Sequence, residues 1–146
     1  IPSSNSVAML SFIKLSRLTG DTEFENYANS IGEYFSADLI RAGSSITHGL
    51  QAVQYLNNSP TELVIVSGKD LDEGTKSVIS EIFSPFKVIL HKSKGQKELE
   101  NLAPYTSQMD VLKERTAFYV CSNFICKKPF NDITELQKLL NSNSLG

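Results

Sequence analysis

The two cysteines, Cys121 and Cys126, are the side chains best suited to redox or nucleophilic chemistry, and five positions separate them. An extended chain would hold them roughly 16 Å apart, beyond the reach of a disulfide, so only a turn at Ser122-Asn123 could bring them together. The spacing is not the Cys-x-x-Cys of a dithiol site. The favoured interpretation is two reduced thiols in the core, and a structural or regulatory disulfide is the alternative.

The two histidines, His48 and His91, are the next candidates, because imidazole titrates near neutral pH. The sequence shows no partner for either one. They are too distant from the cysteines in the chain to suggest a zinc site, and we expect no metal. A Ser/His/Asp triad stays open because its members can lie far apart in a chain, but no Gly-x-Ser-x-Gly motif supports it.

The segment Gly68–Lys76 follows a predicted strand and opens a predicted helix, which is the context of a phosphate-binding loop. The P-loop has four residues between its glycines and then Lys before Ser/Thr. Here five residues intervene, the order is Thr-Lys, and Asp70, Asp72 and Glu73 would repel an anion. We therefore predict a capped helix start and no nucleotide or other cofactor.

The polar cluster Ser3-Ser4-Asn5 precedes the first predicted helix. Serine and asparagine in this place are typical helix N-caps, since their oxygens accept hydrogen bonds from free backbone N–H groups. The same residues could also present donors to a cavity. The local sequence does not choose between a cap and a binding role.

The composition is that of one ordinary soluble domain: 146 residues, 40% hydrophobic, with 14 basic and 16 acidic side chains for a net charge of −2. No apolar run approaches the ~20 residues that span a bilayer, and no signal peptide opens the chain, so we expect a cytoplasmic protein without membrane contact. The charge balance gives no case for nucleic acid. The basic segment 91–97 is followed at once by Glu98 and Glu100, and we interpret it as a solvated loop.

The hydrophobic patterns predict a mixed α/β protein in two parts. Residues 1–59 form a helical hairpin layer of about three helices, the first of them buried on nearly all sides. Residues 60–146 form a small, mainly parallel three-stranded α/β unit with a C-terminal helix. The strands of this unit are predicted from short, continuous runs of β-branched residues. The helices are expected at 7–18, 22–35 and 46–56, then 71–83, 97–103 and 133–140, and the strands at 63–66, 86–90 and 116–121.

Four segments occur here in an order that resembles the C-terminal region of the YyaL and spermatogenesis-associated protein 20 family. They are Ser3–Ala8, Leu15–Asp21, Glu62–Gly68, and Ala117–Cys126 with Pro129. Full-length members of that family carry a thioredoxin-like domain and then an (α/α) toroid similar to six-hairpin glycosidases. The resemblance implies that this chain is cut from a longer protein, with residues 1–59 as the tail of the toroid and residues 60–146 as a small α/β module, the two together forming one compact unit.

By the same resemblance, Ser3, Ser4 and Asn5, with His48, are candidates to face the toroid's cleft, where a sugar-like ligand is expected. The family has glycine where this chain has Ser4. The leading interpretation is that this chain is the C-terminal portion of a YyaL-like protein. It would contribute part of the toroid's cleft and hold no complete active site. The alternative is a carbohydrate epimerase or glycosidase, for which we can nominate no pair of carboxylates.

The second alternative is a redox module in which Cys121 and Cys126 exchange disulfides with the family's thioredoxin-like domain. The expected partners are therefore the upstream domains of the same chain. A second copy is also a candidate partner, through apolar surface that truncation of the longer protein would expose.

Overall fold

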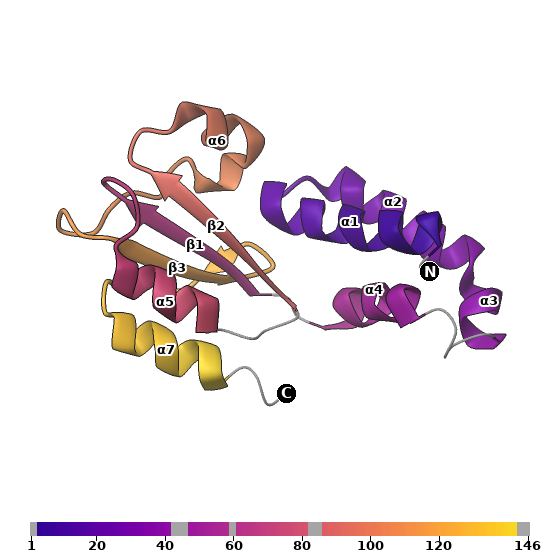
Figure 1. Cartoon of the computed structure of the whole chain (residues 1–146). Coiled ribbons are helices and arrows are strands. Elements are labelled where there is room, and N and C mark those ends of the chain that lie inside the picture. The colour runs from indigo at the N-terminus through magenta and orange to yellow at the C-terminus, as the bar shows by residue number, and fades with distance from the viewer. Residues whose placement is uncertain (1–2, 42–46, 59–60, 82–85, 143–146) are drawn as a thin grey trace. The chain divides into compact units, whose positions relative to one another are not determined.

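A computed structural model describes residues 3–41, 47–58, 61–81 and 86–142. The chain divides into two compact units, Ile1–Pro60 and Thr61–Gly146, which we call the helical unit and the sheet unit. Figure 1 traces their elements along the chain. Each unit is described by itself.

The helical unit contains α1 (Ser4–Thr19), α2 (Thr22–Tyr34), α3 (Ser36–Arg41) and α4 (Thr47–Asn57). Helix α1 packs against α2 and α4. It ends as predicted at Gly20, whose φ of 79° is the left-handed conformation that glycine adopts without steric cost. Helix α2 begins at Thr22, as expected, and its cap is Asp21, whose side chain accepts the Glu23 N–H at 2.9 Å.

The prediction that α1 is buried on nearly all sides is wrong for this chain. Val7 and Leu15 are 43% and 39% exposed, whereas Ser16 and Arg17 are buried. The described neighbours of α1 within the helical unit, α2 and α4, leave Val7 and Leu15 partly uncovered, whereas Arg17 pairs with Glu25 of α2 at 3.2 Å. A polar residue with an ion-pair partner thus displaces apolar residues from the buried face.

Two further details of the helical unit differ from the sequence pattern. Helix α3 occupies part of the segment 36–45 that we expected to be a loop. The apolar spacing of Ile46, Leu50, Val53 and Leu56 predicts that these residues face inward. Instead, α4 buries Gly49, Ala52 and Tyr55, and Leu50 is 37% exposed. Small residues let two helix backbones approach closely. In α4 the small residues Gly49 and Ala52 therefore indicate the buried side of the helix better than Leu50 does. The expected inward residue Ile46 lies outside the described residues.

The sheet unit is built on β1 (Thr61–Ser67), β2 (Lys87–Ser93), β3 (Ala117–Ser122) and β4 (Ile125–Cys126), in the spatial order β2-β1-β3-β4. The mixed α/β class is confirmed. The sheet itself is not mainly parallel: β1 pairs with β2 in parallel, but β1–β3 and β3–β4 are antiparallel. The chain enters β3 beside the carboxyl end of β1, where Ala117 pairs with Val66, and must therefore run back along it.

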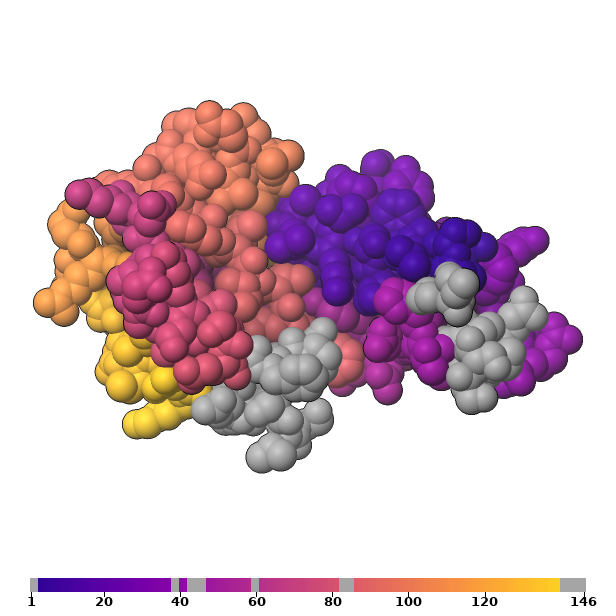
Figure 2. Space-filling model, viewed as in Figure 1, coloured from indigo at the N-terminus to yellow at the C-terminus, as the bar shows by residue number. Residues whose placement is uncertain are grey.

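The two faces of the sheet carry separate apolar clusters. Helices α5 (Glu73–Glu81) and α7 (Ile133–Ser142) lie side by side over one face of the sheet (Figure 1). Their surfaces adjoin in rose and yellow in Figure 2. Beneath them lies a cluster of Leu63, Ile65, Val78, Phe118, Val120 and Leu136. The opposite face carries Val64, Val66, Met109 and Cys121, with Tyr105 packed against them from the 3-10 turn at Pro104–Thr106. Both faces of β1 are thus buried, as its continuous apolar run predicts.

The interpretation of segment 91–97 as a solvated loop is wrong at its start. His91, Lys92 and Ser93 complete β2, and Lys92 is only 2% exposed. Its ammonium group donates to the Thr106 and Met109 carbonyls at 2.7 and 2.9 Å and pairs with Glu100 at 2.9 Å. Three oxygen partners offset the loss of hydration, and they fix the segment after α6 (Lys97–Leu102) against the sheet.

Candidate functional site

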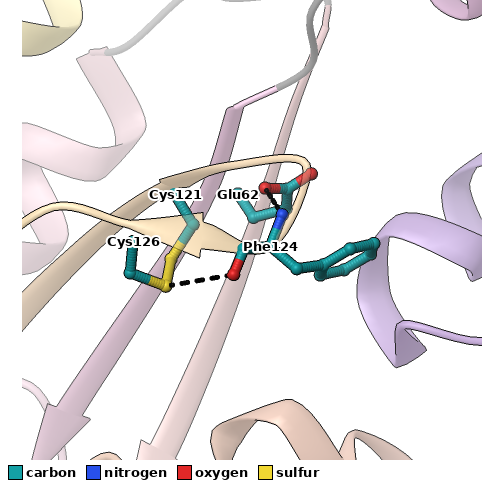
Figure 3. Close-up of a disulfide and its surroundings, with 4 residues drawn as sticks. All are labelled: Glu62, Cys121, Phe124 and Cys126. Carbon is teal, nitrogen blue, oxygen red and sulfur yellow. Dashed lines mark hydrogen bonds between the residues drawn. A yellow bond between two sulfur atoms is a disulfide. The ribbon is translucent and has the colours of Figure 1, made fainter.

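The two cysteines meet across a β-hairpin and form a disulfide, so the interpretation as two reduced thiols is wrong (Figure 3). Cys121 of β3 and Cys126 of β4 are directly opposite in the antiparallel register, with their Cα atoms 3.9 Å apart. Lys127 N–H donates to the Val120 carbonyl at 3.0 Å and continues the pairing beyond them. The distance argument from an extended chain failed because the chain reverses between the two residues.

The reversal occurs at Asn123-Phe124, one residue later than the turn considered from the sequence. Both residues have positive φ, 49° and 62°, as two-residue hairpins of the favoured twist require. Asparagine adopts this conformation readily, but it is uncommon for phenylalanine. Contacts elsewhere in the fold must therefore hold Phe124 in place.

Glu62 on the central strand supplies one of those contacts. Its Oε2 accepts the Phe124 backbone N–H at 3.2 Å, across 62 positions of sequence (Figure 3). Glu62 is completely buried, and it pairs directly with Cys121 in the β1–β3 register. Residues directly opposite in an antiparallel pair project to the same face with Cβ atoms ~5 Å apart. The Glu62 side chain therefore leaves β1 beside that of Cys121, and its carboxyl group reaches the turn at Phe124 (Figure 3).

Tyr105 borders the same place from the 3-10 turn. Its ring packs edge-on against Phe124, with centroids 5.1 Å apart. Burial, and then the negative charge of Glu62, raise the pKa of Tyr105 to about 12. The phenol is therefore neutral throughout the physiological range, and its buried oxygen has no hydrogen-bond partner among the described residues.

The two sulfur atoms differ in accessibility. Cys121 is 1% exposed, whereas Cys126 is only half-buried and lies on the short edge strand beside Ile125, which is 79% exposed. Cys126 Sγ also lies 3.9 Å from the Phe124 carbonyl oxygen. A disulfide sulfur has no proton, so this contact becomes a hydrogen bond only when Cys126 is a thiol. An incoming group can reach Cys126 far more easily than Cys121.

The cluster at the N-terminus of α1 is first of all a helix cap. Ser3 Oγ accepts the Ser6 N–H at 3.2 Å and lies 2.8 Å from Ser6 Oγ. Ser3 and Asn5 also line a small cavity of ≈ 40 Å³ with Ser6 and Gly49. Of the four candidate cleft residues, the structure brings these two together, and neither Ser4 nor His48 lines that cavity. The volume suits one or two water molecules rather than a sugar ring.

His91, for which the sequence showed no partner, has one in the structure. Its Nε2 lies 2.7 Å from Ser67 Oγ, at the carboxyl ends of β2 and β1. The Ser67 hydroxyl donates its proton to the Lys69 carbonyl, so the imidazole is the donor toward Ser67. In the described part of the chain no carboxylate binds the imidazole. The pair joins two strands and lacks the proton arrangement of an activated nucleophile.

The expected helix cap after Gly68 is confirmed. Asp72 accepts the Thr75 N–H at 2.9 Å and the Thr75 hydroxyl at 2.7 Å, and these bonds lower the pKa of Asp72 below its usual range. An open depression of ≈ 930 Å³ lies beside this loop. Its rim mixes Lys69 and Arg115 with four carboxylates, which does not favour phosphate: Asp70, Asp72, Glu114 and Asp132.

Among the described residues, no group of three or more His, Cys, Asp or Glu side chains is arranged to hold a metal ion. The described helices include none with the length and apolar character needed to span a membrane. Comparison with known proteins found no matching family model, no matching curated protein and no matching solved structure.

Proposed function

We propose that the sheet unit is a thiol–disulfide exchange module whose reactive group is the Cys121–Cys126 disulfide. The observation that carries this proposal is the pairing of one buried sulfur with one reachable sulfur across a two-residue hairpin. This arrangement lets a partner approach Cys126 on the edge strand while Cys121 is the leaving sulfur. It corresponds to the second of the alternatives that the sequence left open.

The size of the closed loop supports a reactive role over a purely structural one. A disulfide between residues with a sequence separation of 5 removes little chain entropy, about 2 kcal/mol in the loop-closure treatment. The hairpin is in addition held by backbone hydrogen bonds and by Glu62. In a cytoplasmic protein, as the sequence predicts, disulfides are usually transient and catalytic or redox-sensing. Opening this one would cost the fold little.

The exchange reaction balances with a dithiol protein as the reductant. A partner thiolate attacks Cys126 Sγ, the S–S bond breaks, and its electron pair passes to Cys121 Sγ, which takes up a proton. The second partner thiol then attacks the partner's own sulfur in the mixed disulfide and releases Cys126. The resemblance to the YyaL family suggests that partner: a thioredoxin-like domain upstream in the same chain.

A redox titration tests this function. The protein is equilibrated in dithiothreitol and glutathione buffers of known potential, alkylated, and its free thiols are counted by mass spectrometry. We expect a midpoint potential more oxidising than about −300 mV, the region in which labile disulfides are found. A midpoint well below that value would identify a structural disulfide and contradict the proposal.

Single-cysteine variants test the direction of attack. A thioredoxin-like protein whose second active-site cysteine is replaced by serine, so that a mixed disulfide cannot resolve, serves as the trap. After activation with a thiol-exchange reagent, Cys121→Ser should be trapped at Cys126 at least about tenfold faster than Cys126→Ser is trapped at the buried Cys121, because access controls exchange. Equal trapping rates would refute the assignment of Cys126 as the reachable sulfur.

The second candidate function concerns the helical unit, which we propose forms one edge of a larger carbohydrate-binding cleft. Its support is the cavity lined by Ser3 and Asn5 together with the family resemblance. Because the cavity of ≈ 40 Å³ is too small for a sugar ring, we expect the chain alone to bind sugars no better than about millimolar, at the weak end of affinity. Titration calorimetry with a sugar panel checks this, and micromolar binding would show a self-sufficient site.

A further inference from the structure

The helical unit carries an open groove between α2 and α4, with α1 beneath it. Both α2 and α4 pack against α1. The α1 residue that lines the groove is Met9, which is 2% exposed, and α2 comes close to it at Gly32, where an added Cβ atom would lie 2.9 Å from Met9 Cε. The groove has a volume of ≈ 690 Å³, and its described lining residues all belong to the helical unit.

The α4 wall of the groove is apolar. It presents Leu50, Val53 and Leu56, which recur at intervals of three residues and so follow one side of the helix. Leu50 is 37% exposed, and Ile40 of α3, which lines the same groove, is 84% exposed. Apolar side chains gathered along an open groove favour the binding of an apolar partner surface.

The α2 wall of the groove is acidic and polar. Glu25, Asn29 and Glu33 line it at intervals of four residues, which places them on one face of the helix. Glu25 pairs with Arg17 at 3.2 Å, whereas Glu33 is exposed. Among the described residues that line the groove, none is a lysine, an arginine or a histidine. The groove therefore combines an apolar wall with a wall of negative charge.

We propose that this groove binds an amphipathic helix of a partner protein, with apolar side chains toward α4 and lysine or arginine side chains toward α2. Glu25 and Glu33 both line the groove, and at the helical rise they are about 12 Å apart, the length of about two turns of a bound helix. Helices pack by fitting the side-chain ridges of one between those of its neighbours. The expected anchors are apolar residues at i, i+4 and i+7. This inference is independent of the disulfide exchange proposed above.

The charge of the groove decides the class of partner. Burial of apolar side chains supplies affinity, and opposite charges at the rim select a basic helix over an acidic one. A second copy of this chain is a poor match, because each helix that the structure describes carries at most one exposed lysine or arginine. The fitting partner is therefore a different protein, with a basic amphipathic helix.

Binding of two synthetic peptides to the 146-residue chain tests the proposal by fluorescence anisotropy. Both are labelled fourteen-residue helices of alanine and glutamine, with leucine at the fourth, eighth and eleventh positions. One has lysine at its fifth and twelfth positions, and the other has glutamate there. We expect the lysine peptide to bind at least about tenfold more tightly, because its charges complement the α2 wall. Raising NaCl from about 50 to 500 mM should reduce this ratio, because salt screens exposed charges.

Substitutions at exposed positions assign the site. Leu50→Lys places a charge on the apolar wall, and Glu33→Lys reverses the charge of the acidic wall. Each should weaken binding of the lysine peptide at least about fivefold, and Glu33→Lys should strengthen binding of the glutamate peptide. Leu15→Lys and Glu23→Lys are the matched controls, because these residues are exposed and do not line the groove. Both controls should bind as the native chain does.

The outcomes decide between this partner and the other possible occupants. Stronger binding of the glutamate peptide by Glu33→Lys supports the proposal even if that variant is less stable, since an unfolded chain would bind neither peptide. Failure of both peptides to bind, equal affinity for the two, or equal losses in groove and control variants overturns it. Ultracentrifugation without peptide tests the second copy: a dimer that Leu50→Lys dissociates would show that this chain itself fills the groove and would overturn the proposal.

Discussion

The helical unit and the sheet unit differ in how completely they cover their apolar side chains. In the sheet unit each face of β1 has its own cover, and Leu63 and Ile65 are 0% exposed. Large exposed apolar side chains among the described residues fall mainly in the helical unit, as Val7, Leu15, Tyr27, Tyr34, Ile40 and Leu50, against Leu102 and Ile125 in the sheet unit. Exposed apolar groups gathered on helices are typical of surfaces that contact a partner.

This difference predicts where the stability of the protein resides. A sheet covered on both faces folds around its own core, whereas helices that leave large apolar side chains exposed gain less from burial. The sheet unit should therefore be the more stable part. The predictions that follow compare matched changes in the two units.

The largest effect is expected from removing a core ring. Phe118→Ala deletes a side chain that is 2% exposed and lies 5.7 Å from the Phe130 ring. We expect a loss of about 3–5 kcal/mol in the free energy of unfolding, because the transfer and cavity terms add. Leu15→Ala in the helical unit, where the side chain is 39% exposed, should cost less than about 1 kcal/mol. Urea unfolding followed by circular dichroism measures both, and equal losses would contradict the comparison.

The next effect concerns one ion pair in each unit. Lys92→Met removes an ammonium group with three oxygen partners and leaves Glu100 facing the sheet. We expect a cost of about 3 kcal/mol, as for other buried pairs that lose one member. Arg17→Met, whose partner Glu25 is 34% exposed, should cost about 1 kcal/mol, nearer to the value for surface pairs. Hydrogen exchange by mass spectrometry locates each loss, and faster exchange in residues 97–109 is the expected sign for Lys92→Met.

The smallest effect is expected at the helix caps. Asp21→Ala in the helical unit and Asp72→Ala in the sheet unit each remove an acceptor at a helix start, at about 1 kcal/mol. The bond from the Thr75 backbone N–H lowers the folded-state pKa of Asp72 below 3.8. Its contribution is therefore complete above pH 3.8 and is lost as the pH falls through the lower folded value.

Acid titration of the unfolding free energy checks the cap prediction. In Asp72→Asn the amide oxygen still accepts a hydrogen bond but the side chain cannot titrate, so stability below pH 4 should depend less on pH than in the native protein. Asp70→Asn is the control, because Asp70 lies two residues before the cap residue Asp72. This variant should leave the acid profile unchanged. An identical acid profile in Asp72→Asn would show that this cap does not contribute to the pH dependence.

Local signals in the sequence predicted the features that depend on near neighbours. Gly20 ends α1, Asp72 caps the helix after β1, and the run Leu63–Val66 forms a buried strand. Each follows from backbone conformation or from periodicity within a few residues. The alternation of Phe118 and Val120 against Tyr119 and Cys121 likewise follows from the period of a strand.

Features that depend on distant residues could not be predicted in this way. Glu62 is one acid at the start of an apolar run, and nothing near it indicates that it meets Phe124 across 62 positions. The burial of Lys92 likewise depends on carbonyl groups 14 and 17 residues away. An ionisable side chain inside a β-branched run indicates that the side chain is buried with a partner. Which residue is that partner can be seen only in the folded structure.

The sequence by itself therefore determined the mixed α/β class, the main helices and the central strand, because each depends on short-range geometry and on apolar periodicity. The tertiary structure alone decided the antiparallel direction of β3, the pairing of Cys121 with Cys126 and the position of Glu62 beside them. These three depend on where the chain returns after a long connection. A turn of two residues and one long-range hydrogen bond then join a carboxyl group to the hairpin that carries the disulfide.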